Sequence, residues 1–173
     1  MEYIVNKKYP EIKVEKKNIY YARLLQNIYA GVSGEITTFM LYNYQSLEKY
    51  DIDNEYSNII RQLAEVELIH VNILGKLINL LGMQPVYCYV PDNTNVFVNW
   101  NGSYINYNGD LNNMIKTNIQ LEMDNINQYL NATSCIKDKY VLENIYRIID
   151  NKERHLELFN KLLQNYSDKW DKK

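Results

Sequence analysis

The stretch that most restricts how this chain can fold is residues 64–70, where Glu67 and His70 stand three positions apart in a long run with helical periodicity. At this spacing both side chains leave a helix on the same face. Leu63 and Leu74 continue that face in both directions, so both polar side chains should point into a core. A buried charge needs a partner, which is either a metal ion or simply the neighbouring side chain.

Four segments repeat apolar residues at helical spacing for longer than a strand would. They cover residues 19–49, 55–81, 111–130 and 138–166. The short turn after the first segment predicts antiparallel neighbours, and the Pro-, Gly- and aromatic-rich residues 83–109 predict a long crossover, with room for a short hairpin. The sequence therefore predicts an all-α, left-handed four-helix bundle with a long crossover between its second and third helices.

The same pattern predicts the domain organisation. We expect an extended N-terminal arm over residues 1–18, a single four-helix domain over residues 19–166, and a polar tail over residues 167–173. A chain of 173 residues is large enough to bury its own core without a disulfide or a structural zinc ion.

Composition and charge exclude several classes of function. The formal net charge is only −2, which argues against nucleic acid and anionic membranes as partners. Cys88 and Cys135 form no Cys-x-x-Cys pair, which argues against a rubredoxin-type iron site, although a single disulfide between them is left open. No apolar run approaches the roughly 18 residues of a membrane-spanning helix. We therefore expect a cytoplasmic protein without membrane or nucleic-acid partners.

Glu35 is a second candidate for an inward carboxylate. It follows Gly31 and Gly34 within the first helical segment, and each glycine costs about 1 kcal/mol relative to alanine inside a helix. We expect the two glycines to allow close approach to a neighbouring helix or a ligand. Apolar residues one and two turns away from Glu35 favour an inward side chain over an exposed one. Glu35, Glu67 and His70 should then meet at one level, as half of a dimetal site.

The second half of the chain repeats this arrangement with Glu122 and His155. Glu35 precedes His70 by 35 positions and Glu122 precedes His155 by 33, and each pair is carried by two successive helices. The only two histidines in the chain therefore occupy equivalent positions in two helical hairpins. Inward Glu and Glu-x-x-His ligands from four helices are how dimetal sites are built in bundles. The repeat favours a metal site over two incidental core histidines.

At these residues the sequence resembles the ferritin-like dimetal carboxylate proteins, and within them the manganese catalases and their small spore-coat relatives. The resemblance covers most of residues 20–163. Its motifs are Tyr-Ala-Gly-Val-Ser-Gly-Glu ending at Glu35, Glu-x-x-His ending at His70 with a trailing Leu-Gly-x-Leu-Ile, Glu122, and Arg-Ile-Ile-Asp-x-x-x-x-His ending at His155.

The resemblance implies a ferritin-like fold, a homo-oligomer, and two metal ions, with manganese preferred over iron. Carried over by position, Glu35, Glu67 and His70 would hold one metal. Glu67 would also reach the second, which Glu122 and His155 would bind. The implied reaction is the disproportionation of hydrogen peroxide, with both metals cycling together, in a cytoplasmic or spore-associated protein.

Lys152 departs from the family pattern, because members usually carry a glutamate three positions before the last histidine. Three ligand glutamates contribute −3 against +4 for two divalent ions, and a protonated Lys152 adds a further positive charge. We expect Lys152 to be neutral, to point away, or to weaken binding of the second metal. Asp150 and Glu153 could compensate only through a local helix bulge, because regular helix geometry turns both away from the His155 face.

Three functional readings remain open from the sequence. The first is a manganese-catalase-like oxidoreductase weakened by Lys152, and the second is a ferritin-like di-iron oxidase or peroxidase. The third is a non-enzymatic coat or scaffold bundle in which Lys152 forms salt bridges to Glu67 or Glu122 and no metal binds. Carboxylate and imidazole ligands accept both manganese and iron, so the ligands alone do not identify the metal.

Overall fold

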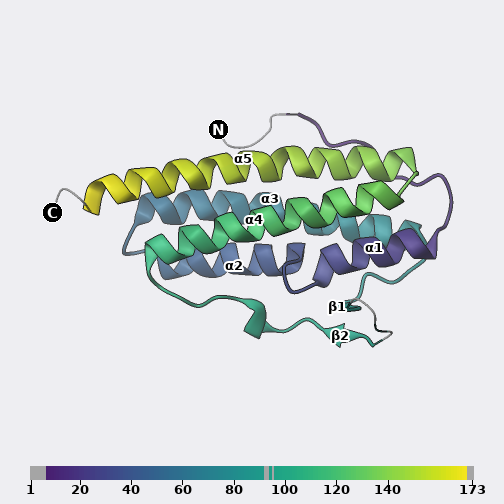
Figure 1. Ribbon diagram of the computed structural model, residues 1–173, viewed down its shortest axis with the longest axis horizontal. Helices are drawn as coiled ribbons and strands as arrows, with labels where there is room; N and C mark the ends of the chain where they lie inside the picture. The colour runs from purple at the N-terminus through teal and green to yellow at the C-terminus, as the bar shows by residue number, and fades with distance from the viewer. Residues whose placement is uncertain (1–6, 92–93, 95, 171–173) are drawn as a thin grey trace.

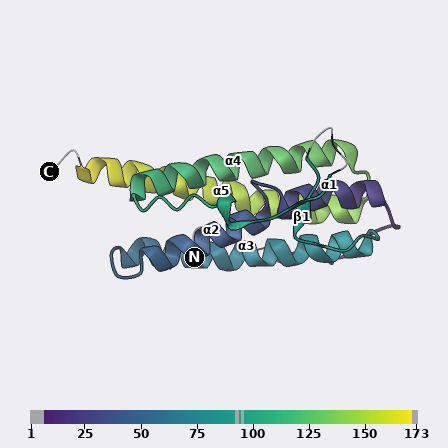
Figure 2. The same ribbon diagram turned by 90° about the horizontal axis from the view of Figure 1, so that it is seen from below.

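The computed structural model describes residues 7–91, 94 and 96–170, except for the side chains of residues 167–170. Helices run side by side along the long axis as four legs, of which α1 and α2 together form the first (Figure 1 and Figure 2). The helices are α1 (Ile19–Ala30), α2 (Glu35–Glu48), α3 (Asn54–Leu80), α4 (Leu111–Cys135) and α5 (Lys139–Trp170). This confirms the predicted all-α four-helix bundle with its long crossover between the second and third legs.

The prediction of one continuous helix over residues 19–49 was wrong, because residues 31–34 form a turn between α1 and α2. A Cβ on Gly34 would lie 2.7 Å from the carbonyl oxygen of Ile28 and 2.8 Å from the nitrogen of Gly31. The glycines therefore allow close approach within the backbone itself, between the turn and the last residues of α1. Glu35 becomes the first residue of α2, where the helix dipole favours a carboxylate.

Polar side chains cap the first turns of the helices. Asn18, Asp53 and Asp110 each accept a backbone N–H of the first turn, as N-cap residues do. Asp138 accepts the N–H groups of residues 140 and 141 at the start of α5. At the other end of α3, Gly82 adopts a left-handed φ of 103°, which suits glycine and ends the helix.

Two helices are longer than the sequence suggested. α4 continues to Cys135 rather than ending near residue 130, and the hydroxyls of Thr133 and Ser134 hydrogen-bond backbone carbonyls one turn back. These bonds let polar residues that usually favour loops continue the helix. α5 extends to Trp170, into the predicted polar tail, whereas residues 171–173 lie outside the described part of the chain, as does the start of the arm, residues 1–6.

The crossover contains the short hairpin that its composition suggested. Strands β1 (Cys88–Tyr89) and β2 (Val98–Asn99) pair antiparallel, followed by the 3-10 turn η1 (Gly102–Tyr104). The side chain of Gln26 in α1 donates to two backbone carbonyls of the crossover, at 2.6 and 2.7 Å. These hydrogen bonds fix the crossover against the bundle. Cys88 is buried and Cys135 exposed, and both are free thiols, so the disulfide left open by the sequence is absent.

Residues 7–18 run without helix or strand along α5 (Figure 1). Arg147 donates two hydrogen bonds to the carbonyl of Lys7, at 3.0 and 2.8 Å. The backbone N–H of Glu15 donates to Asp138 at 2.6 Å. The N-terminal segment is therefore fixed to the helix that carries His155.

Two apolar clusters fill the two ends of the bundle. One includes Leu25, Leu77 and Ile145, and the other includes Leu63 and Phe159. In each of the four legs the candidate ligands lie between the two clusters, so a polar layer divides the core. Among the described residues, no helix is both long and apolar enough to span a membrane.

We predict opposite effects of alanine at two glycines. Gly34→Ala should lower the free energy of unfolding by about 1–3 kcal/mol, because its Cβ would clash with backbone atoms that cannot move easily. Gly75→Ala is the matched control within α3: its Cβ would meet only ordinary contacts at 3.7 Å, so it should stabilise the protein by about 0.5–1 kcal/mol. Urea unfolding measures both, and equal midpoints would contradict the account of the turn.

Candidate metal centre

The structure brings all five predicted ligands into one buried layer of the bundle. The side chains of Glu35, Glu67, His70, Glu122 and His155 are each fully buried. They form two groups whose ligand atoms lie within 4.8 Å of one another and which share Glu67. Group A is Glu35, Glu67 and His70, and group B is Glu67, Glu122 and His155.

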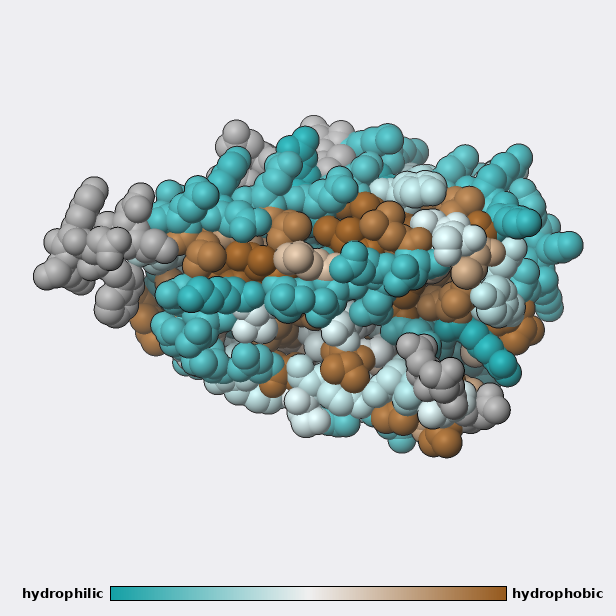
Figure 3. Space-filling model, in the orientation of Figure 1, coloured by the Kyte–Doolittle hydropathy of each residue, from teal (hydrophilic) through white to brown (hydrophobic). Residues whose placement is uncertain are grey.

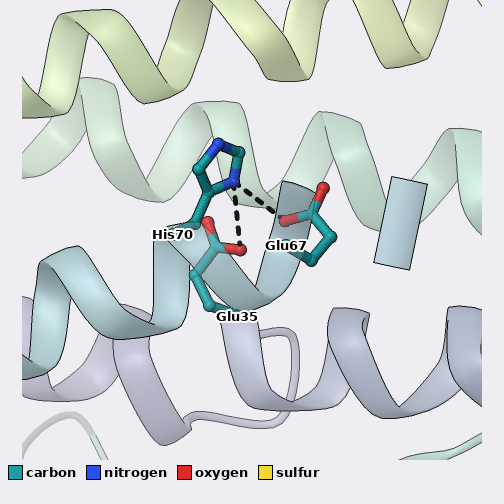
Figure 4. A group of neighbouring side chains, drawn as sticks. All are labelled: Glu35, Glu67 and His70. Carbon is teal, nitrogen blue, oxygen red and sulfur yellow. Dashed lines mark hydrogen bonds and ion pairs between the residues drawn. The ribbon is translucent and has the colours of Figure 1, made fainter. Parts of the chain in front are cut away.

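Group A joins α2 to α3. Figure 4 shows the His70 ring and the two carboxylates turned toward one another between these helices. His70 Nδ1 lies 3.0 Å from Glu67 Oε2 and 3.8 Å from Glu35 Oε2. The predicted half site in the first helical hairpin is therefore assembled.

Group B joins α3 to α4 and α5. His155 Nδ1 lies 2.9 Å from Glu67 Oε1 and 3.1 Å from Glu122 Oε1. The two oxygens of Glu67 thus face different histidines, and the two imidazole rings lie 6.4 Å apart. This geometry lets Glu67 bridge the two groups.

Lys152 points into the centre of this cluster and is fully buried. Its Nζ lies 2.6 Å from Glu67 Oε2, 3.0 Å from Glu35 Oε2 and 3.4 Å from Glu122 Oε2. Of the three outcomes that the sequence left open, a side chain that points away is therefore excluded. Glu153 is exposed on the same helix, as expected, and does not replace the missing family glutamate.

The charges of the cluster shift its pKa values. Burial opposes an ammonium, yet the surrounding carboxylates raise the pKa of Lys152 above its usual value, so it is charged. Burial by itself would raise the pKa of Glu67, but the charges of Lys152 and His70 hold it well below its ordinary value. Burial raises the pKa of Glu35 despite Lys152. Burial opposes a charged His155, but hydrogen bonds to two carboxylates raise its pKa to about 9.

Two tyrosines that the sequence motifs do not include belong to the cluster. Tyr42 donates to Glu122 Oε1 at 2.6 Å, and Tyr129 donates to Glu35 Oε1 at 2.5 Å. Burial, and then the neighbouring carboxylates, raise the pKa of both phenols well above the usual value. Each tyrosine stands seven positions after a ligand glutamate, and this repeated spacing could have revealed them.

The internal repeat is visible in these contacts. Tyr42 and Tyr129 each follow the glutamate of their own half and bond the glutamate of the other half. In the sequence Lys152 stands 85 positions after Glu67, the same offset that separates the two histidines. Lys152 is therefore the counterpart of Glu67 in the second half, and it supplies an ammonium where the first half supplies a carboxylate.

Three further residues lie on the Nε2 side of the His70 ring, away from the carboxylates. Asn151 Nδ2 lies 3.0 Å and Tyr9 Oη 3.1 Å from His70 Nε2. Arg147 donates to Asn151 Oδ1 at 2.7 Å and stacks on the Tyr9 ring, 4.3 Å from its centroid. No sequence pattern points to Tyr9, because its contact with His70 depends on how the N-terminal segment crosses α5.

The donor atoms fit a metal ion better in group B than in group A. Within the described part of the chain, one oxygen of each ligand glutamate, namely Glu35 Oε2, Glu67 Oε1 and Glu122 Oε2, receives no well-directed hydrogen bond. Carboxylate and imidazole donors of this kind suit manganese or iron. In group A, by contrast, the ammonium of Lys152 already lies against the ligand oxygens of Glu35 and Glu67.

Comparison with known proteins connects this layer to one family. Residues 1–86 match the family described as manganese containing catalase. A probable manganese catalase from Clostridium acetobutylicum is 27% identical over 179 residues, which cover 94% of this chain and 79% of that protein. In sequence the chain is similar to the manganese catalases.

Solved structures of KatB, a manganese catalase from Anabaena, share the fold of this chain. One matches with a TM-score of 0.81 at 22% identity and covers 95% of this chain and 81% of KatB. A wild-type KatB structure matches with a TM-score of 0.80 at 22% identity over 94% of this chain and 80% of KatB. The bundle is therefore ferritin-like, as the sequence motifs implied.

We predict that Lys152→Met strongly destabilises the metal-free protein. Removing the ammonium leaves three buried carboxylates without their closest counter-charge, and breaking a buried ion pair typically costs about 3–5 kcal/mol. The control is Arg154→Met on the same helix, whose ion pair with Glu157 is exposed and should contribute less than about 1 kcal/mol. Urea unfolding in the presence of a chelator measures both, and similar losses for the two variants would contradict the prediction.

Proposed function

We propose that this protein is a manganese-catalase-like dimetal-carboxylate protein that disproportionates two molecules of hydrogen peroxide into two of water and one of oxygen. The observation that supports this most directly is the convergence of three carboxylates and two imidazoles in one buried layer. The family match of residues 1–86 and the likeness to a probable manganese catalase support the same chemistry.

In this proposal Glu35, Glu67 and His70 would hold one ion, and Glu122 and His155, together with Glu67, would hold the other. The ions, with manganese preferred and iron accepted by the same donors, would supply the two-electron change that peroxide disproportionation requires. The bridging carboxylate of Glu67 would keep the two positions at a fixed separation.

The surrounding side chains would orient the ligands. The phenols of Tyr42 and Tyr129 donate to Glu122 and Glu35, which fixes each carboxylate and leaves its other oxygen to face the centre. The apolar clusters on both sides of the layer would limit entry of water and strengthen the electrostatic interactions within it.

Lys152 would limit this activity. Two unit charges about 4 Å apart interact by roughly 4 kcal/mol at an effective dielectric near 20, and here the ammonium would be repelled by each metal ion. We therefore propose weak disproportionation compared with relatives that carry a glutamate at this position.

A second candidate function is a non-enzymatic coat or scaffold bundle that binds no metal. The contacts of Lys152 with three carboxylates favour it, because they join α2, α3, α4 and α5 by ion pairs alone. Metal analysis of protein purified without chelator distinguishes the two candidates, since the scaffold would carry no stoichiometric manganese or iron.

We also propose that the protein forms a homo-oligomer in the cytoplasm. Several large apolar side chains of the crossover are exposed, among them Tyr87, Phe97 and Tyr107. Figure 3 shows a further band of apolar residues along the long axis, bordered by hydrophilic ones. Exposed apolar surface of this kind commonly marks a contact between proteins.

We predict that Lys152→Glu raises both metal content and activity. The substitution removes a positive charge and restores the Glu-x-x-His spacing, so manganese should approach two ions per chain and oxygen release from peroxide should increase about tenfold or more. Lys161→Glu makes the same charge change at an exposed position of α5 and should alter neither quantity. Metal analysis and an oxygen electrode measure both, and an unchanged Lys152→Glu protein would contradict the charge argument.

Self-association provides a separate prediction. Sedimentation at tens of micromolar protein should show a species larger than one chain, because the exposed aromatic residues of the crossover would be covered by a second copy. Phe97→Asp should shift the distribution toward the monomer, whereas Ile52→Asp in the turn between α2 and α3 is the control. A monomeric wild-type protein would rule out the homo-oligomer.

A further inference from the structure

The oxygens of group A are already occupied by a cation. Lys152 Nζ lies 3.0 Å from Glu35 Oε2 and 2.6 Å from Glu67 Oε2, the two oxygens that face His70 Nδ1. A divalent ion bound there would sit about 2.0–2.2 Å from the same oxygens. An ion at these oxygens would lie next to the ammonium and be repelled by it, so a metal in group A would have to displace the ammonium of a buried lysine.

His70 is also held in the wrong form for binding a metal. Arg147 donates to Asn151 Oδ1, which fixes the amide so that Nδ2 faces His70 Nε2 at 3.0 Å. An amide nitrogen only donates, so Nε2 must accept, and the ring proton then resides on Nδ1. That proton points at Glu67 Oε2, 3.0 Å away, and a protonated Nδ1 has no lone pair for a metal.

Group B carries neither obstacle. Lys152 Nζ lies 3.4 Å from Glu122 Oε2, its longest carboxylate contact, and it approaches the Oε2 atom of Glu67 rather than the Oε1 atom that faces His155. Within the described residues His155 Nε2 has no hydrogen-bond partner, so no donor fixes the ring proton on Nδ1. His155 can therefore present Nδ1 to an ion.

Charge balance favours a single ion. A metal ion binds the neutral imidazole, and with both imidazoles neutral the three ligand carboxylates and the ammonium of Lys152 carry a net charge of −2. One divalent ion neutralises this buried layer, whereas two would leave it at +2. An uncompensated buried charge is costly, so the second ion is disfavoured.

We propose that this chain binds one divalent metal ion, in group B, and that the ammonium of Lys152 together with the Nδ1 proton of His70 takes the place of the second ion in group A. This inference rests on the metal binding of the proposed function and narrows it from two ions to one, held in group B. It makes Asn151 and Arg147 positioning residues, because they act on the metal site through His70.

The first test counts and characterises the bound ions in the wild-type chain. Metal-free protein is incubated with excess Mn(II), freed of unbound metal, and examined by elemental analysis and low-temperature electron paramagnetic resonance. We expect about one manganese per chain and the hyperfine pattern of an isolated Mn(II) ion. Two ions per chain with an exchange-coupled spectrum would overturn the inference.

A matched pair of variants locates the ion. His155→Ala should weaken Mn(II) binding at least about tenfold more than His70→Ala, the same truncation in group A. Equal losses in the two variants would overturn the assignment to group B. Circular dichroism checks that both variants fold, and if His155→Ala does not, the wild-type ion count and spectrum decide.

A double variant tests what blocks group A. Lys152→Met with Asn151→Asp removes the ammonium and gives His70 Nε2 an acceptor, so Nδ1 becomes free. We expect manganese to rise to about two ions per chain with a coupled spectrum. A double variant that still holds one isolated ion would show that these residues do not block group A.

The outcomes separate this inference from the proposed function. One isolated ion without oxygen release from peroxide supports the inference and contradicts the proposed activity. Two coupled ions with oxygen release contradict the inference and support the activity. A wild-type chain that binds no manganese contradicts both.

Discussion

The placement of three carboxylates at one buried level of the bundle is the constraint on which the rest of the structure depends. Each carboxylate would be strongly destabilising if it were left without a counter-charge in an apolar core. The chain meets this requirement with two imidazoles, two phenols and one ammonium, all from side chains of the same layer. The apolar clusters then fill the two ends of the bundle, so that each of α3, α4 and α5 changes from apolar to polar to apolar along its length.

The positions of these groups depend on local backbone features far from the chemistry. The turn at residues 31–34 makes Glu35 the first residue of α2 and so fixes its height in the bundle. The N-terminal segment reaches the layer from outside, where Tyr9 contacts both Asn151 and His70. A change in either segment would therefore act on the cluster without removing any of the charged side chains.

Much of this arrangement could be predicted from the sequence because it repeats. Helical periodicity predicted the four legs, and the matching positions of His70 and His155 predicted that the ligands would converge. The turn at Gly31 and Gly34 was missed because a periodic apolar pattern continues across it. Tyr42 and Tyr129 were missed because a buried tyrosine and an apolar core residue occupy the same helix face, and only the structure shows which atoms their hydroxyl groups reach.

The two halves of the chain share one scaffold but supply opposite charges at one equivalent position. Glu67 and Lys152 both reach the centre from the position three before a histidine, and they bond each other at 2.6 Å. Carboxylates at both positions would repel each other, and metal ions between them would compensate this repulsion. The Glu67–Lys152 pair needs none in group A, because the lysine brings its positive charge covalently attached to the fold. This single exchange converts a layer that depends on two metal ions into one that is held together by its own side chains and still leaves group B with donors for an ion.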